Sequence, residues 1–261
     1  MILIAGCLRF ITQTDLLEII RKRGVLRIGT PGDYHALSYF DGQKFVGYDI
    51  DMASYLAEQL GVDVDFVLTE RPELVSGLYL GKFDIAMGGI PRTVSRQFEV
   101  EQTRGYMTFS HALLVTAENQ ERFHSFEKVN LPGVKVGVAI GEVYEKLAGQ
   151  YFPEATIVPF ENHLNIPLAV RSGQIDAMMT EMPLALFYQT TEKQLKVIRE
   201  QTLTAQNQFS YLLPVGQQRL LNMVNLIMDE VKLKGVEQQL MAKHTLIESS
   251  GSTEAENNFE K

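Results

Sequence analysis

Apolar residues recur along the first third of the chain in two rhythms, one typical of strands and one typical of helices. The strand candidates either alternate apolar and polar positions or form short apolar runs, and they span 25–30, 62–68 and 83–87. The helix candidates carry apolar residues three and four positions apart or begin with proline, and they span 13–24, 50–60 and 72–80. Strand, helix, strand, helix and strand at this spacing indicate a parallel sheet with crossover helices.

The same kind of pattern returns later in the chain, without any repetition of the sequence itself. Strands are predicted over 134–138, 155–160 and 175–180, and helices over 142–151, 163–172 and 183–190. The apolar segments 112–116 and 209–214 flank this second unit and are candidates for strands that cross between two lobes. Residues 220–233 and 236–243 predict two closing helices.

These elements predict an α/β protein with two lobes, each a mostly parallel sheet flanked by helices. We expect a leader remnant and helix over 1–23, lobe 1 over 24–111, a hinge strand over 112–116, lobe 2 over 117–208, a return strand and helices on lobe 1 over 209–247, and a disordered tail over 248–261. A chain of 261 residues has room for two such lobes.

Charge and composition narrow the function. The formal net charge of −8 and the lack of a basic run argue against nucleic acid as a partner. The histidines have no metal-ligand spacing, and no phosphate-binding Gly-rich loop occurs, so we expect no metal and no cofactor. Cys7 follows a short apolar stretch that either is the end of a lipoprotein leader or is a chance likeness.

Ligand chemistry is expected at the turns that follow the predicted strands, because open parallel sheets bind ligands beyond their carboxyl ends. Four turns qualify, and they span 31–39, 88–96, 139–143 and 180–183. Two lobes that face each other would enclose a small ligand between these turns when the hinge closes.

The stretch from Gly47 to Leu60 opens with Gly47-Tyr48-Asp49-Ile50-Asp51-Met52 and matches the pattern G-[FY]-D-[IV]-D-[LM] at every position. On physical grounds alone it is an amphipathic helix with favourable carboxylates in its first turn. Together with residues 83–90 and 93–96, it resembles the extracellular solute-binding proteins of family 3, the amino-acid receptors of ABC importers. The resemblance implies a type II periplasmic-binding-protein fold, a small-molecule ligand, a monomer, a periplasmic location and an ABC permease as partner.

The same resemblance implies which residues bind the ligand. Arg96 matches the arginine that holds the α-carboxylate, and a planar guanidinium suits that task. Gly89 matches a position of close backbone approach, Tyr34 an aromatic that stacks on the ligand side chain, and Glu181 the carboxylate that binds the α-amino group. The expected site is completed by neighbouring turn residues, namely Asp33, Tyr39, Arg71, Glu142 and Val143.

Three positions depart from the amino-acid receptor pattern. Pro91 replaces a hydroxyl residue, Arg71 replaces a second aromatic clamp, and Glu142 replaces a threonine. The added charges favour a ligand with further polar or charged groups. Alternatively, Arg71 and Glu142 form an ion pair with each other.

An enzymatic alternative comes from closer local likeness to cyclohexadienyl dehydratase, for example in Gly32-Asp33-Tyr34 and Tyr211-Leu212-Leu213-Pro214. That reaction needs a general acid, and the position expected for it holds Leu184. Glu142 or Glu181 would have to replace the acid. A third possibility is a sensor domain whose transduction partner is another chain.

Overall fold

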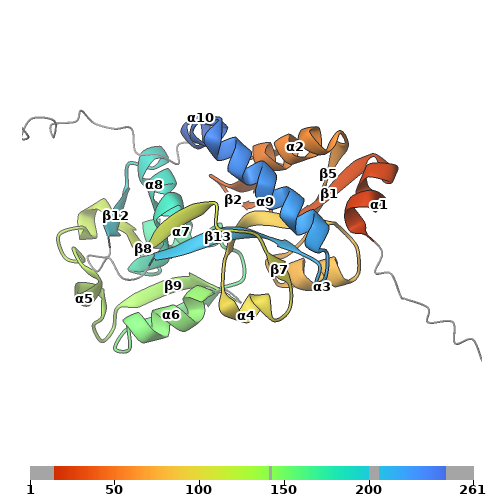
Figure 1. Cartoon of the computed structure of the whole chain (residues 1–261). Helices are drawn as coiled ribbons and strands as arrows, with labels where there is room; N and C mark the ends of the chain where they lie inside the picture. The colour runs from red at the N-terminus through yellow and green to blue at the C-terminus, as the bar shows by residue number, and fades with distance from the viewer. Residues whose placement is uncertain (1–14, 141–142, 200–205, 245–261) are drawn as a thin grey trace, which may run out of the picture.

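The computed structural model describes residues 15–140, 143–199 and 206–244, and it confirms the expected two-lobed α/β architecture. Figure 1 shows two groups of helices and strands, with β8 (Met107–Thr116) and β13 (Gln206–Leu213) running between them. We call residues 15–106 and 214–244 lobe 1, residues 117–140 and 143–199 lobe 2, and β8 and β13 the crossing strands.

Lobe 1 follows the predicted alternation of strands and helices. Its elements before the crossing are α1 (Leu16–Arg23), β1 (Val25–Thr30), β2 (Asp33–Tyr34), β3 (Ser38–Phe40), β4 (Phe45–Val46), α2 (Tyr48–Leu60), β5 (Asp63–Leu68), η1 (Arg71–Glu73), α3 (Leu74–Tyr79), β6 (Ile85–Pro91), α4 (Val94–Gln97) and β7 (Glu101–Gln102). β1 lies between β5 and β6 and pairs in parallel with both. The carboxyl ends of β1 and β6 therefore meet at one edge, where the predicted ligand turns begin.

Lobe 2 repeats this arrangement. Its elements are η2 (Ala117–Asn119), α5 (Phe126–Val129), β9 (Lys135–Ala139), α6 (Val143–Tyr151), β10 (Thr156–Phe160), α7 (Asn165–Arg171), β11 (Ala177–Glu181), α8 (Met182–Thr191) and β12 (Leu195–Arg199). β9 pairs in parallel with β10 and β11. The sequence analysis did not predict β12, which pairs antiparallel with β8.

The crossing strands join both lobes into one 10-stranded sheet. β8 changes partners along its length, because residues 107–110 pair with β13 whereas residues 111–116 pair with β11 and β12. We propose that this change, between Ser110 and His111, marks the passage from lobe 1 to lobe 2, just before the hinge expected at 112–116.

Two helices close the chain on lobe 1, namely α9 (Gln218–Leu233) and α10 (Val236–Lys243). One face of α9 is buried, with Leu220, Val224, Ile227 and Val231 at helical spacing. The Lys243 ammonium donates to the Asp51 carboxylate at 2.7 Å and so ties α10 to α2. Figure 1 shows both helices beside α2.

Two buried features fix the sheet of lobe 1. The Asp84 carboxylate accepts from the Arg27 backbone N–H at 2.8 Å and is ion-paired with the guanidinium groups of Arg23 and Arg27. The Phe83 ring fills the space left by two glycines, since a Cβ on Gly29 or Gly77 would lie 2.5 Å from that ring. Larger residues at either glycine would therefore displace the ring.

Candidate functional site

Asp33, which follows β1, forms a charged pair with Arg71, which follows β5, beside the buried ring of Tyr34. The Arg71 guanidinium donates to both oxygens of Asp33, from Nη2 to Oδ1 at 2.7 Å and from Nε to Oδ2 at 2.9 Å. Burial alone would raise the pKa of the Asp33 carboxyl, but the charge of Arg71, its hydrogen bonds and smaller contributions together outweigh burial and hold that pKa below its ordinary value. The Arg71 Cζ atom lies 5.9 Å from the centroid of the Tyr34 ring. Three predicted ligand residues therefore contact one another.

Gly89, the position of expected close approach, is held by the helix that carries the signature. Its N–H donates to the Asp49 carboxylate at 2.8 Å, and its φ of +65° is a conformation that glycine adopts without strain. A Cβ at this position would lie 2.5 Å from Tyr34 Cδ1. The signature aspartate thus fixes the backbone of β6 at Gly89, a role that the position of Asp49 in the first turn of α2 did not reveal.

Asp49 itself is fully buried in a network of hydrogen bonds. Besides the Gly89 amide, it accepts from the hydroxyls of Tyr106 at 2.9 Å and Tyr211 at 3.1 Å. Burial raises the pKa of the Asp49 carboxyl to about 6, against the opposing effect of these donors. Burial also raises the pKa of both tyrosines, so both hydroxyls remain donors at neutral pH.

Arg96 lies in α4, directly beyond the end of β6. The Thr93 hydroxyl caps this short helix by accepting from the Arg96 backbone N–H at 3.2 Å. The Arg96 guanidinium donates from Nη1 to the Pro91 carbonyl at 2.5 Å. The arginine is therefore anchored to the strand end where the resemblance places the ligand's carboxylate.

Glu181 ends β11 and is buried, with 2% of its surface exposed. One carboxylate oxygen accepts from the Thr180 hydroxyl at 3.1 Å, and Glu181 is opposite His111 in the pairing of β11 with β8. The resemblance places the ligand's α-amino group at this carboxylate, at the carboxyl end of β11.

Strand register places Glu181 and the end of β6 on the same face of the sheet. Directly opposed residues of antiparallel strands share a face, as do alternate residues along one strand. Pro91 is opposite Phe209, which is opposite Met107, and His111 is opposite Glu181. Because Met107 and His111 are four residues apart on β8, all five side chains project from one face.

The lobes contact each other through aromatic side chains, of which His35, His163 and Phe187 were not singled out from the sequence. The His35 imidazole stacks between Tyr39 at 3.9 Å and Phe187 at 4.9 Å, measured between ring centroids. Tyr34 contacts His163 edge-on at 6.4 Å. His35 lies in the predicted ligand turn 31–39, so its position, rather than metal-ligand spacing, was the signal that could have identified it. His163 begins a predicted helix, and no sequence signal marked it.

His111 is a further polar residue at the crossing. It is buried, its Nδ1 lies 3.3 Å from the Tyr144 hydroxyl, and its Nε2 lies 3.2 Å from Asn207 Nδ2. Burial lowers the pKa of His111 and so favours the neutral imidazole. These contacts link α6 of lobe 2 to the crossing strand β13.

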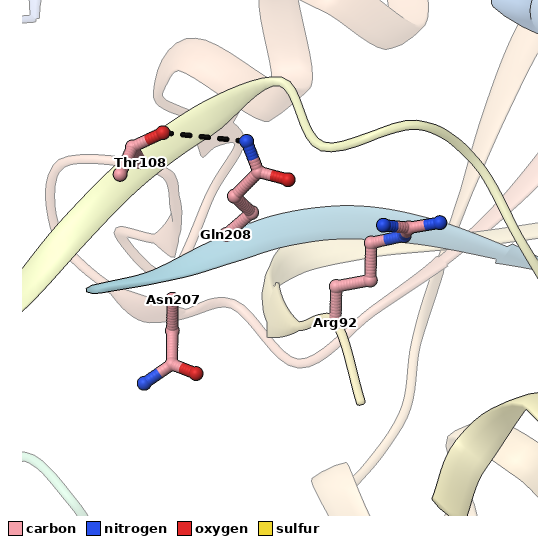
Figure 2. Close-up of a pocket in the computed structure, with 4 residues that line it drawn as sticks. All are labelled: Arg92, Thr108, Asn207 and Gln208. Atoms are coloured by element: carbon pink, nitrogen blue, oxygen red, sulfur yellow. Dashed lines mark hydrogen bonds between the residues drawn. The ribbon is translucent and has the colours of Figure 1, made fainter. Parts of the chain in front are cut away.

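A cavity of about 360 Å³ lies at the crossing, and the described residues that line it are Arg92, Thr108, Asn207 and Gln208. Figure 2 shows Thr108 and Gln208 on one side of β13, joined by a hydrogen bond of 3.3 Å, and Asn207 pointing to the other side. The predicted ligand residues are not among the residues that line this cavity.

The structure gives no side-chain contact for two predicted site residues, Glu142 and Val143. Glu142 lies outside the described residues, so its proposed pairing with Arg71 stays a prediction, and so does its ligand contact. Val143 begins α6.

Within the described residues, no group of three or more His, Cys, Asp or Glu side chains could hold a metal ion. No helix of the described ranges has the length and apolar character needed to cross a membrane.

Comparison with known proteins agrees with this architecture. Residues 26–246 match the model of the bacterial extracellular solute-binding proteins, family 3. Cyclohexadienyl dehydratase of Pseudomonas aeruginosa is 31% identical over 203 residues, which are 77% of this chain and 76% of that enzyme. The L-cystine-binding protein TcyA of Bacillus subtilis is 26% identical over 234 residues, which are 88% of this chain and 84% of that protein.

Solved structures of one ancestral protein, AncCDT-1, are also similar. One is described as an amino acid-binding precursor of cyclohexadienyl dehydratase and the other as a cationic amino acid solute-binding protein. Both are 36% identical to this chain, with TM-scores of 0.82 and 0.76, and cover 87% of this chain and 98% of theirs. Because the family match extends over residues 26–246, the chain belongs to the bacterial extracellular solute-binding proteins of family 3.

Proposed function

We propose that the chain captures an amino acid or a related small carboxylate between its lobes and delivers it to an ABC permease. One observation supports the proposal: lobe 1 carries the Arg96 guanidinium, anchored at the end of β6, and lobe 2 carries the Glu181 carboxylate, buried at the end of β11. These are the two charges that a zwitterion requires, and each lobe provides one. The names of the relatives, which include binders of cystine and of cationic amino acids, support the ligand class.

In this proposal the Arg96 guanidinium binds the α-carboxylate with two parallel hydrogen bonds, and Glu181 accepts from the α-ammonium. Tyr34 packs on the ligand side chain, and the Gly89 backbone approaches the ligand because no Cβ intervenes. Closure of the lobes excludes water and strengthens both ionic contacts. The aromatic contacts of His35 and Tyr34 with lobe 2 stabilise the closed form.

Thermal denaturation of the purified protein with each of the 20 common L-amino acids tests this function. We expect at least one to raise the melting temperature and to bind in isothermal titration calorimetry. Arg96→Ala should abolish binding, whereas Arg92→Ala, an exposed arginine four positions earlier, should not. If no amino acid or small carboxylate binds, or if Arg96→Ala binds as tightly as the wild type, the proposal is wrong.

Dehydratase activity is the second candidate, and the identity with cyclohexadienyl dehydratase favours it. The position expected for the acid holds Leu184, whose side chain is 1% exposed in the core of lobe 2 and donates no proton. The chemistry would then need the carboxylic acid of Glu142 or Glu181. Incubation with prephenate and arogenate should give no product, and turnover that Glu181→Gln or Glu142→Gln removes would establish the enzymatic alternative.

We further propose a periplasmic location with lipid attachment at Cys7, which lies outside the described residues. Such attachment would place the protein in the membrane fraction of cells that produce the full chain, and Cys7→Ser would release it. Recovery of the wild-type protein in the soluble periplasmic fraction would exclude the anchor.

A further inference from the structure

The Asp33–Arg71 pair has the two features with which a protein recognises a cationic side chain. A carboxylate would receive the cation's N–H donors, and an aromatic face beside it would attract the positive charge. Here Asp33 provides the carboxylate, and the adjoining Tyr34 provides the ring. A side chain of the protein itself, Arg71, already occupies the place of such a cation. Its guanidinium donates to both Asp33 oxygens, and its Cζ atom lies 5.9 Å from the centroid of the Tyr34 ring.

This pair lies at the boundary between the lobes, where a ligand side chain is expected. Tyr34 contacts His163 of lobe 2, and the next residue, His35, stacks on Phe187 of the same lobe. The two charged side chains are only partly exposed, 15% for Arg71 and 24% for Asp33. Charges in such a setting are screened less than surface charges, so their effect on a nearby ligand charge is large.

We propose that Arg71 is a specificity-determining residue that excludes amino acids with cationic side chains by occupying their subsite. This inference rests on the proposed function and narrows its ligand class to amino acids with uncharged or acidic side chains. A ligand cation meets a carboxylate that already accepts from Arg71 Nε and Nη2, and a guanidinium of like charge, so competition for the carboxylate and repulsion both act against it. The lowered pKa of Asp33 agrees with a carboxylate that stays ionised within this pair.

The arrangement predicts a gain of binding when the internal guanidinium is removed. In Arg71→Gln the Asp33 carboxylate loses its partner and becomes available to a ligand cation. We expect this variant to bind L-arginine or L-lysine at least about tenfold more tightly than the wild type does. The double variant Asp33→Asn/Arg71→Gln should lose that gain, because it lacks the carboxylate. Arg21→Gln removes one exposed positive charge from α1 of lobe 1 and controls for the change in net charge.

Isothermal titration calorimetry of the wild type and these variants with L-arginine, L-lysine, L-glutamine and L-glutamate is the test. Circular dichroism establishes that each variant is folded. The wild type alone provides a second measurement, since it should bind both cationic amino acids at least about tenfold more weakly than its best uncharged or acidic ligand.

A wild type that binds arginine or lysine best, or a folded Arg71→Gln variant with an unchanged ligand preference, overturns the assignment of Arg71 while the proposed receptor function stands. A wild type and an Arg71→Gln variant that bind no amino acid overturn this inference, and the receptor function is overturned with it only if no other small carboxylate binds either.

Discussion

The buried Asp49 carboxylate should give the folded protein a distinctive dependence of stability on pH. Its Oδ2 accepts from the Gly89 amide and the Tyr106 hydroxyl, and its Oδ1 accepts from the Tyr211 hydroxyl. Asp49→Asn keeps the shape and removes the titratable charge. The amide oxygen replaces one acceptor, and the amide N–H can donate to a tyrosine oxygen, so most of the network survives.

The sign and size of the effect follow from the pKa of Asp49. Burial raises that pKa from 3.8 to about 6, so between these values the folded state binds more protons than the unfolded chain. The free energy of unfolding therefore falls as the pH rises through this window and levels off above it. Full ionisation costs the folded state about 3 kcal/mol. The asparagine variant lacks this term, so relative to the wild type it should gain up to about 3 kcal/mol between pH 4 and pH 7.

Urea denaturation followed by far-ultraviolet circular dichroism at pH 4, 5, 6 and 7 measures this difference for the wild type and Asp49→Asn. Asp51→Asn is the matched control, two residues further along the same helix. Burial would raise the pKa of Asp51, but hydrogen bonds from Lys243 and His244 outweigh burial and lower it. The contribution of Asp51 to stability therefore changes mainly below pH 4, so the stability difference of the Asp51 variant should stay nearly constant between pH 4 and pH 7. A stability difference for Asp49→Asn that is flat, or that falls, between pH 4 and pH 7 would refute the reasoning.

Three further substitutions test other parts of the site and the fold. Gly89→Ala forces a Cβ to within 2.5 Å of Tyr34 Cδ1 at a φ of +65°, so calorimetry should show ligand affinity reduced by about tenfold or more. His35→Ala removes the stack on Phe187, worth about 1 kcal/mol, and small-angle X-ray scattering should show a larger radius of gyration for the ligand-bound protein. Asp84→Asn weakens a buried ion-paired network, and urea denaturation should show a loss of about 3 kcal/mol. Unchanged values in each case would contradict the role assigned to the substituted residue.

The fold was largely predictable because most elements carry strong local signals. Alternation in β1 and β9 and the apolar stripe of α2 repeat over several residues, so the assignments did not depend on one position. The missed strand β12 is short, follows a helix directly and lies against β8. Its pairing depends on a strand about 80 residues earlier in the chain, and local periodicity contains no information about such a partner.

The site was predictable in its backbone positions but less so in its contacts. The strand-end rule and the signature led to Tyr34, Gly89 and Arg96, which lie at the ends of the expected strands. The partner of Arg71 was not evident, because Asp33 is 38 residues away and its carboxylate could equally have faced solvent or ligand. The role of Asp49 was hidden for the same reason, since the Gly89 amide lies 40 residues further along the chain.

The central claim is that one solute carboxylate binds to Arg96 of lobe 1 while the solute's ammonium binds to Glu181 of lobe 2. A crystal structure of the protein with the amino acid that binds most tightly in the calorimetric panel tests this most directly. We predict two hydrogen bonds from the Arg96 guanidinium to the α-carboxylate and a contact between the α-ammonium and the Glu181 carboxylate, within closed lobes. A bound amino acid that contacts neither side chain, or that lies outside the space between the lobes, would contradict the account.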